Sequence, residues 1–251
     1  MAATTPAGAP SAADMAATRA TIQSRAAKDP TGASLESLLS GEFSLQSGKL
    51  TDASSAYLKA ARAAGDLVLA ERATSIALVA KQDTTAAEAL ALWRKLGGTG
   101  ASIIAAEATL ALRRGDDRAA LRQLNDLMTS EPDTGWRQAL GVLTAGAKDQ
   151  KQAARVLEKL VDGGKLPQRN LMAWVAFGGL SQRLDQPKLP ERIVSEVVKR
   201  FPGEPRVGLL RVSQLREDGK TEEATQLLAS LVPLADTDTN LRALIAEQYE
   251  G

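Results

Sequence analysis

Two glutamates lie inside otherwise apolar stretches, where a carboxyl group could be tuned for acid–base chemistry. Glu42 and Glu107 each have mainly alanine, leucine and other apolar neighbours, and burial shifts the pKa of such a group toward values that suit catalysis. No nucleophile and no cluster of metal ligands accompanies either residue. We therefore interpret both as members of ion pairs between helices, Glu107 with Arg113 or Arg114. A hydrolase built on a helical array is the enzymatic alternative, and substitution of these acids would test it.

The sequence lacks the residue types that most enzymes need for catalysis. It contains no histidine and no cysteine, which removes the commonest general base, the commonest transition-metal ligand, thiolate metal sites and disulfides. The glycine-rich segment 97–100 is not a phosphate-binding loop, because no Lys-Ser or Lys-Thr follows it and no strand precedes it. We expect a chain that is not an enzyme and that holds no metal and no cofactor.

Charge and hydropathy narrow the possible partners. The 251 residues include 31 basic and 30 acidic side chains, and the net charge of +1 gives no electrostatic footprint for DNA or RNA. No apolar stretch approaches the roughly 18 residues that span a bilayer, and the N-terminus has no apolar signal core. The sequence predicts a soluble segment whose partners are proteins, with no nucleic acid.

An alanine that recurs at nearly constant spacing along the chain indicates which secondary-structure elements are present. The gaps between successive members are 36, 31, 33 and 71 residues, the last being two repeats of about 35. A period near 34 is typical of tetratricopeptide-like helix pairs. The small residue marks the point where the second helix of a pair crosses its neighbours most closely, and larger apolar residues share its face. The series is Ala53, Ala89, Ala120, Ala153 and Ala224, each followed four residues later by Tyr57, Trp93, Leu124, Leu157 and Leu228.

The sequence therefore predicts an all-α fold, a right-handed α-solenoid of about six tetratricopeptide-like helix pairs. Residues 1–11 are expected to be a disordered Ala/Pro linker, residues 12–33 a loose leading helix, and residues 34–251 the superhelix. Pro190 takes the place of the alanine in the fifth pair and lies in the first turn of its helix. A final helix at 238–249 has no partner in view, so it is either a cap or a sign that the chain continues in a longer protein. The predicted pairs are 35–45 with 53–64, 67–80 with 85–96, 101–114 with 118–130, 136–147 with 149–161, 171–184 with 190–200, and 207–217 with 221–232.

The stretch from Leu38 to Lys81 resembles the opening of a family of tetratricopeptide-repeat outer-membrane lipoproteins of Gram-negative bacteria. The shared features are Leu38-Leu39 with Glu42-Phe43, the step from Ala53 to Tyr57, and the LAERAT core of residues 66–77. Residues 131–139 and 201–228 continue in the same style, so that the resemblance covers roughly residues 34–231. The signal peptide and the lipid-bearing cysteine of that family are absent here, and the family is longer.

The resemblance implies a function and a location. Members of the family are adaptors for a periplasmic carboxy-terminal processing protease, so the chain is expected to be a non-enzymatic scaffold that delivers substrates to this protease or activates it. The full-length protein would be periplasmic and anchored in the outer membrane, through a lipid that this segment does not carry. A scaffold for envelope or exopolysaccharide assembly is the alternative, and the proteins that co-purify would distinguish the two.

The concave face of such a solenoid is expected to bind the partner. Five basic residues at first-helix positions predict a mildly positive groove for acidic or extended segments, and a solvated helix face is the alternative interpretation. The pattern of lysines and asparagines that clamps a C-terminal carboxylate in some tetratricopeptide domains is not in register. The expected groove residues are Glu42, Gln46, Lys81, Gln82, Arg113, Gln138, Arg183, Arg206 and Arg216.

Large and very small side chains inside the helices have structural explanations. Trp93, Trp136 and Trp174 fall at repeat-core positions, so packing is favoured over a role as binding hot spots. The pair Gly178-Gly179 lies in the middle of a predicted helix, where glycine is unfavourable. We expect a close approach between helices to compensate, because Gly178 and Gly141 occupy the same small position of their repeats.

Overall fold

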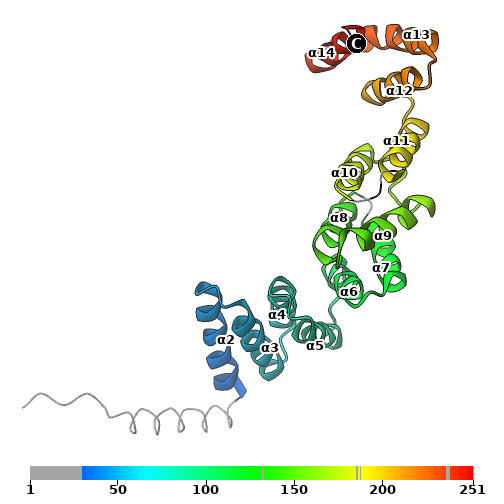
Figure 1. The fold of residues 1–251 in the computed structure, drawn as a ribbon. Helices are drawn as coiled ribbons and strands as arrows, with labels where there is room; N and C mark the ends of the chain where they lie inside the picture. Colours follow the sequence, from blue (N-terminus) through cyan, green and yellow to red (C-terminus); the bar gives the residue numbers. More distant parts are fainter. Residues whose placement is uncertain (1–29, 132, 185, 187, 236–237, 251) are drawn as a thin grey trace, which may run out of the picture. The chain divides into compact units, whose positions relative to one another are not determined.

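The computed structural model describes residues 30–131, 133–184, 186, 188–235 and 238–250 (Figure 1). The predicted linker at 1–11 and nearly all of the predicted leading helix at 12–33 lie outside these residues. The chain divides into two compact units, Met1–Leu110 and Ala111–Gly251. The division falls within one helix, α6 (Ala101–Arg114).

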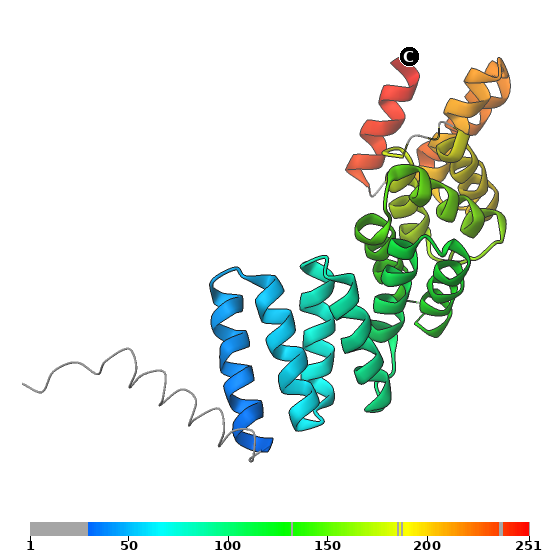
Figure 2. The same cartoon turned by 60° about the horizontal axis from the view of Figure 1, so that its bottom comes forward.

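The first unit is a row of antiparallel helices. It holds α2 (Pro30–Gln46), α3 (Leu50–Ala64), α4 (Leu67–Val79), α5 (Asp83–Lys95) and most of α6. Helices α2, α3 and α4 each contact the next helix in the chain, and α3 also contacts α5. The blue and cyan helices of this unit lie side by side (Figure 2). Contacts to the next helix and the next but one are the pattern of stacked helix pairs.

The second unit repeats this arrangement. Helices one apart contact each other at α7–α8, α8–α9, α10–α11 and α12–α13, and helices two apart at α7–α9, α8–α10, α9–α11 and α12–α14. Its elements are α7 (Asp117–Ser130), α8 (Gly135–Gly146), α9 (Gln150–Asp162), α10 (Leu171–Ser181), α11 (Lys188–Arg200), α12 (Pro205–Glu217), α13 (Thr221–Leu231), the 3-10 helix η1 (Val232–Ala235) and α14 (Thr239–Glu250).

The predicted all-α solenoid of helix pairs is confirmed. The described part of the chain holds thirteen α-helices and no strand, and α2 to α13 follow one another in chain order at the places predicted for six pairs. We call the even-numbered helices first helices and the odd-numbered helices second helices; α14 is a first helix without a second. Pro190 lies in the first turn of α11, as predicted. The handedness of the solenoid and its continuity as one superhelix over residues 34–251 stay predictions.

Short polar side chains start several of these helices. Each accepts a hydrogen bond from the backbone N–H three residues later, which satisfies a donor that the first turn leaves without a partner. The donor–acceptor distances lie between 2.7 and 3.1 Å. The capping residues are Asp66, Asp116, Asp149, Asn170 and Asp238.

The repeated alanines form the centre of the packing, as the spacing predicts. Ala53, Ala89, Ala120 and Ala224 are completely buried, and Ala153 is 4% exposed. The larger residues four positions later are also buried, with at most 3% of their surface exposed. A methyl group at the closest point of crossing, followed by a large side chain one turn later, therefore fixes how each second helix packs.

The expectation of a close helix approach at Gly141 and Gly178 is wrong. A Cβ atom on Gly141 or Gly179 would meet no atom within 4 Å, and one on Gly178 would lie 3.5 Å from Ile193 Cγ2, an ordinary contact. Two other glycines of first helices are crowded. A Cβ on Gly41 would lie 3.0 Å from Tyr57 Cδ2, and one on Gly208 would lie 2.8 Å from Leu231 Cδ2.

Candidate functional site

Large apolar side chains that remain exposed gather on the first helices. Twelve such residues occur in the described part of the chain, each at least 41% exposed. Ten lie on first helices, two lie in η1, and none lies on a second helix. Because a solvent-facing apolar surface of this kind marks an interaction site in many soluble proteins, the first-helix faces are the candidate site. The ten are Leu35, Leu39, Phe43, Val68, Val79, Met172, Val175, Leu210, Leu244 and Tyr249; Val232 and Leu234 lie in η1.

In the first unit these residues form two parallel stripes. Leu35, Leu39 and Phe43 follow one another at intervals of four along α2 and are 50–68% exposed. Val68 and Val79, 65% and 70% exposed, lie eleven residues apart on α4 and so share one face of that helix. We call these two stripes together the α2–α4 surface.

A three-residue cluster connects the two stripes and explains Glu42. Arg72, on the same face of α4 as Val68, places Nη2 3.3 Å from Glu42 Oε1, and its guanidinium lies 5.0 Å from the centre of the Tyr57 ring. The Tyr57 hydroxyl donates a hydrogen bond to Glu42. Burial of Tyr57 and this hydrogen bond raise its pKa to about 12. Glu42 is therefore a member of an inter-helix pair, which confirms its interpretation from the sequence.

Glu107 also forms an inter-helix ion pair, although not with the arginines named from the sequence. Its carboxylate pairs with Arg94 on α5, whereas Arg113 and Arg114 come from the last turn of its own helix. The other carboxylate oxygen, Oε2, is buried and has no hydrogen-bond partner. The ion-pair interpretation holds for both glutamates.

In the second unit the exposed apolar residues continue into a cleft. Met172 and Val175 are 65% and 56% exposed on α10, and Gly179 and Arg183 extend the same helix face at intervals of four. Arg183 follows the end of α10 in a turn, where its N–H donates to the Leu180 carbonyl at 3.0 Å. The cleft has a volume of about 320 Å³ and is lined by Leu143, Thr144, Ala147, Asp149, Gln150, Ala153, Leu180, Arg183 and Leu184.

We call this cleft, with the exposed faces of α8 and α10 beside it, the α8–α10 surface. Among the described residues, no ion pair or hydrogen bond engages the Arg183 guanidinium. Of the five basic residues expected in a groove, Arg183 lines this cleft, from the turn that follows α10.

Lys81 does not lie on a first-helix face, contrary to expectation. Helix α4 ends at Val79, and Lys81 occupies the following turn with φ +56°, the left-handed region. Its N–H donates to the Leu78 carbonyl, and the next N–H, that of Gln82, donates to the Ala77 carbonyl. This pattern of two backbone bonds closes the helix end. Lys81 therefore belongs to the turn between α4 and α5.

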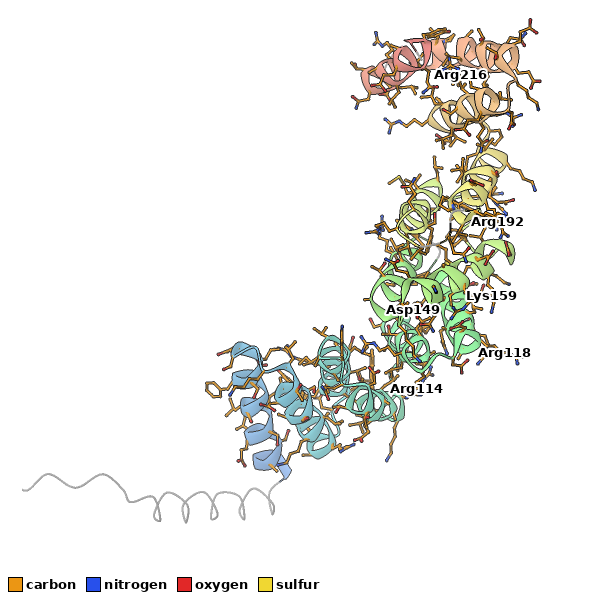
Figure 3. All side chains as sticks on the ribbon, in the orientation of Figure 1. Arg114, Arg118, Asp149, Lys159, Arg192 and Arg216 are labelled. Atoms are coloured by element: carbon orange, nitrogen blue, oxygen red, sulfur yellow. The ribbon has the colours of Figure 1, made fainter. Side chains whose placement is uncertain are left out.

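Arg206 and Arg216 hold the last helix instead of lining an open groove. Arg206 Nη2 lies 3.2 Å from the Asp238 carboxylate, and the Arg216 guanidinium donates to the Gln248 carbonyl. Arg216 is labelled in Figure 3. The two arginines come from opposite ends of α12 and reach opposite ends of α14, so the helices run parallel. The backbone N–H of Leu241, and Arg206 after it, hold the pKa of Asp238 below its usual value. Arg113 is half-buried in the last turn of α6.

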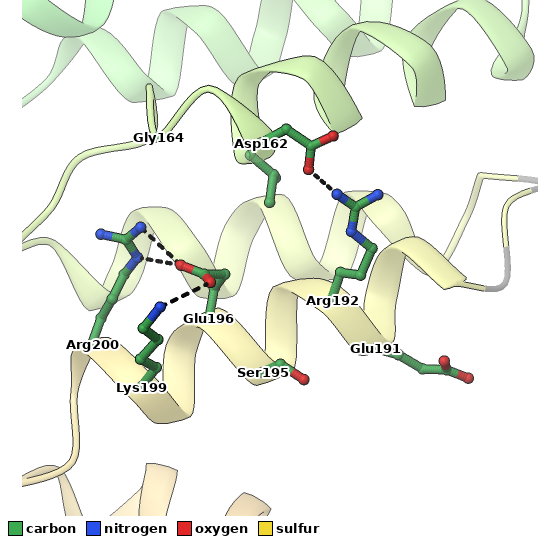
Figure 4. Close-up of a pocket in the computed structure, with 9 residues that line it drawn as sticks. Asp162, Gly164, Glu191, Arg192, Ser195, Glu196, Lys199 and Arg200 are labelled. Atoms are coloured by element: carbon green, nitrogen blue, oxygen red, sulfur yellow. Dashed lines mark hydrogen bonds and ion pairs between the residues drawn. The ribbon is translucent and has the colours of Figure 1, made fainter.

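A second cleft, between second helices α9 and α11, is lined by charges that pair with one another (Figure 4). Its volume is about 560 Å³. Arg192 binds Asp162 and also lies 2.7 Å from Glu158, and Arg200 binds Glu196 at 2.8 Å. These ion pairs already neutralise the charges of the arginines and carboxylates. The cleft therefore connects α9 and α11 and is a poor site for a charged ligand.

The three tryptophans pack inside the solenoid, as expected. Trp93, Trp136 and Trp174 are between 0% and 6% exposed. The indole N–H groups of Trp136 and Trp174 donate to backbone carbonyls at 3.0 and 2.9 Å. These rings are therefore part of the core, and the apolar residues that could meet a partner are the smaller ones on the first helices.

Sequence reasoning did not identify the exposed apolar stripe of α2. In the sequence, the leucines and the phenylalanine between residues 35 and 45 together indicated one helix, without a distinction between buried and exposed positions. Leu38 and Leu45 pack against the core, while Leu35, Leu39 and Phe43 face outward. The signal was present in the spacing, because intervals of four define a second stripe that a single buried face does not need.

Two further findings concern metals and membranes. Within the described ranges, no group of three or more acidic side chains is placed to hold a metal ion. No helix in the same ranges is long and apolar enough to cross a bilayer.

Comparison with known proteins gives a likeness in structure alone. No protein-family model matches the chain, and no curated protein does. A tetratricopeptide repeat protein from Parabacteroides merdae ATCC 43184 is similar with a TM-score of 0.42 and 10% identity, over 94% of this chain and 93% of that one. The TPR domain of P58(IPK) is similar with a TM-score of 0.36 and 14% identity, over 96% of this chain and 70% of that one. The description of this chain as a solenoid of helix pairs rests on its own contacts.

Proposed function

We propose that this protein is a non-enzymatic scaffold that binds other proteins through its first helices. The observation that supports the proposal is the segregation of exposed apolar side chains, ten of twelve on first helices and none on second helices. A chain that left such residues exposed at random would place some of them on both kinds of helix. A surface that is apolar on one side only fits a partner that covers that side.

The finer proposal is an adaptor for a periplasmic carboxy-terminal processing protease. The opening part of the resemblance to this adaptor family, residues 38–81, also builds most of the α2–α4 surface. Leu39 and Phe43 lie at its beginning, and Val68 and Val79 lie near its end. An adaptor acts by effective concentration: a protease and its substrate held on one scaffold meet far more often than they would free in solution.

A scaffold for envelope or exopolysaccharide assembly is the alternative function. It would use the same first-helix surfaces with different partners. Co-purification from the native organism separates the two, because the adaptor brings down the processing protease and the alternative brings down proteins of the assembly machinery.

The adaptor proposal is tested with the 251-residue chain and the purified processing protease of the same organism. The chain should bind the protease, speed cleavage of its substrates, and cleave nothing by itself. The double variant Leu39→Glu/Phe43→Glu should bind at least tenfold more weakly, since each buried apolar side chain contributes about 1.5–3 kcal/mol. Both positions are at least 50% exposed, so the variant should remain folded.

The matched control changes two exposed positions of a second helix at the same spacing. Ser55→Glu/Lys59→Glu on α3 should leave binding unchanged. If the chain captures no protease and does not change its activity, the adaptor proposal fails. If capture is normal in the α2 variant and lost in the α3 variant, the first helices are not the binding surface.

A further inference from the structure

Two exposed glycines interrupt first helices without any packing reason. Gly141 in α8 and Gly179 in α10 are exposed, and a Cβ atom on either would meet nothing within 4 Å. Glycine weakens the interior of a helix relative to alanine, and it is useful where another backbone approaches closely. No part of the described chain makes that approach. Both glycines thus leave helix backbone open, and Gly179 does so on the face of α10 that also carries Val175.

Both glycines lie one turn before a residue that lines the α8–α10 cleft. Thr144 follows Gly141 by three residues, and Arg183 follows Gly179 by four. The cleft wall is mostly aliphatic, with Leu143, Leu180 and Leu184. At about 320 Å³ it lies at the lower end of the range for ligand pockets and suits one or two apolar side chains.

The charges around this cleft favour an anionic group. Arg183 lines it, and among the described residues nothing pairs with its guanidinium. The other basic side chains nearby are engaged elsewhere: Lys148 Nζ would lie 3.1 Å from a Cβ on Gly115, in the turn after α6, and the Arg137 guanidinium lies 4.8 Å from the Trp136 ring centre. The one carboxylate in the cleft wall is Asp149, which accepts the Gln152 N–H at 2.7 Å as a helix cap. The arginines between α9 and α11 differ from Arg183, because each already pairs with a carboxylate.

We propose that the α8–α10 surface binds an extended segment of a partner protein that carries an apolar side chain close to a carboxylate. The apolar side chain enters the cleft, the carboxylate pairs with Arg183, and the segment's backbone passes over Gly179. Arg183 follows Gly179 by four residues, in the turn that closes α10, and one turn of helix rises about 6 Å, which corresponds to about two residues of extended chain. The apolar side chain and the carboxylate are therefore about two residues apart. This inference rests on the proposed scaffold function and names the kind of segment that one of its surfaces takes.

The carboxylate can belong to an acidic side chain or to a chain terminus, and peptides distinguish these sources. Fluorescein-labelled peptides of about six residues, the length that spans the exposed face of α10 when extended, are titrated with the full chain. One carries leucine with aspartate two residues later and an amidated end. The others replace the aspartate by asparagine, replace it by a free C-terminal carboxylate, or replace the leucine by glycine. Fluorescence anisotropy gives each dissociation constant.

The wild-type chain should bind at least one carboxylate-bearing peptide about tenfold more tightly than the asparagine peptide, the scale of a charge-assisted hydrogen bond. Arg183→Gln should abolish this preference and leave the asparagine peptide unaffected. Gly179→Leu should weaken the carboxylate peptides about tenfold while the melting temperature stays the same or rises, because the added side chain meets open space. Lys199→Gln, which removes an equal charge from α11, should change no dissociation constant.

Three results would overturn the inference. The first is that no peptide binds the wild-type chain at millimolar concentration. The second is that Arg183→Gln weakens the aspartate and asparagine peptides equally, and the third is that Gly179→Leu binds as the wild type does. Capture of the processing protease, measured in parallel, separates this failure from that of the scaffold. Intact capture without peptide binding rejects only the α8–α10 site, whereas loss of both rejects the adaptor function as well.

Discussion

The same substitution, glycine to alanine, should have opposite effects at two positions in the middle of first helices. At Gly179 the added methyl group meets no atom within 4 Å, so the better helix propensity of alanine should raise the free energy of unfolding by about 0.5–1 kcal/mol. At Gly41 the same methyl group would lie 3.0 and 3.1 Å from two carbon atoms of the Tyr57 ring. The outcome there depends on whether the ring can move.

The ring of Tyr57 is held on several sides. It is 0% exposed, its hydroxyl is bonded to Glu42, and Arg72 lies over its face. Overpacking of this kind costs about 1–3 kcal/mol, and the gain in helix propensity offsets about 1 kcal/mol of it. Gly41→Ala should therefore lower the free energy of unfolding by about 1 kcal/mol.

Thermal unfolding followed by circular dichroism checks both signs, with hydrogen exchange to locate the effect in α2 and α3. A change of 1 kcal/mol moves the melting temperature of a chain of this size by about 2–4 °C. In a Tyr57→Leu background, Gly41→Ala should cost less, because the clashing ring is gone and contacting sites are not additive. The reasoning is refuted if Gly41→Ala stabilises the chain as much as Gly179→Ala does.

The remaining predictions concern titration, the seam between pairs, and the last helix. Because the pKa of Tyr57 is raised from 10.0 to about 12, the folded state holds this proton more tightly; its contribution is complete below pH 10 and should be lost between about pH 10 and 12. Tyr57→Phe should remove that alkaline loss from urea denaturation curves, and an unchanged curve would contradict the burial of this hydroxyl. Ala120→Leu, at a completely buried seam, should destabilise by about 1–3 kcal/mol and speed hydrogen exchange in neighbouring helices only, so a global effect or none would argue against the repeat placement. Asp238→Ala should speed exchange in the first turn of α14, whereas Asp238→Asn, which keeps the cap, should do so less. Since the pKa of Asp238 is lowered, the wild type should lose this protection as acid protonates the carboxylate, and the alanine variant should show no such dependence.

The helix pairs were predictable because their signal is local. The spacing of Ala53, Ala89, Ala120, Ala153 and Ala224 identifies the second helices without any knowledge of what lies across from them. Methyl groups at one period and large apolar residues four positions later describe a single helix face. The structure buries all of these residues, and the helix boundaries follow from the glycines, prolines and caps between them.

The side-chain partners were not predictable to the same degree, because they depend on what the next helix places opposite. Glu107 pairs with Arg94 of the preceding helix, and sequence distance alone favoured the arginines on its own helix. Gly41 is crowded and Gly178 is not, because Tyr57 faces the first and Ile193 only touches the second. The size of one residue does not predict how closely two helices approach unless the size of the residue opposite it on the neighbouring helix is also known.

The candidate site shows the same limit. A basic residue on a first helix was taken to face a partner, yet Arg206 and Arg216 bind α14. A variant that reverses the charges of Arg206, Arg216 and Arg183 together would therefore loosen the last helix. A loss of binding by that variant could then come from a folding defect. Arg183 alone is the informative substitution, since nothing in the described chain pairs with its side chain.

The contacts between helices one and two apart have a consequence for how the protein is made. Within each unit, a helix finds its main partners among the two that precede it in the chain. Contacts of such short sequence separation form quickly, because little loop entropy opposes them. A chain emerging from the ribosome can therefore cover the buried face of each pair soon after its synthesis, before distant segments exist. Within each unit, translation order and stacking order coincide, so that the helix made last is the one whose buried face still lacks its cover.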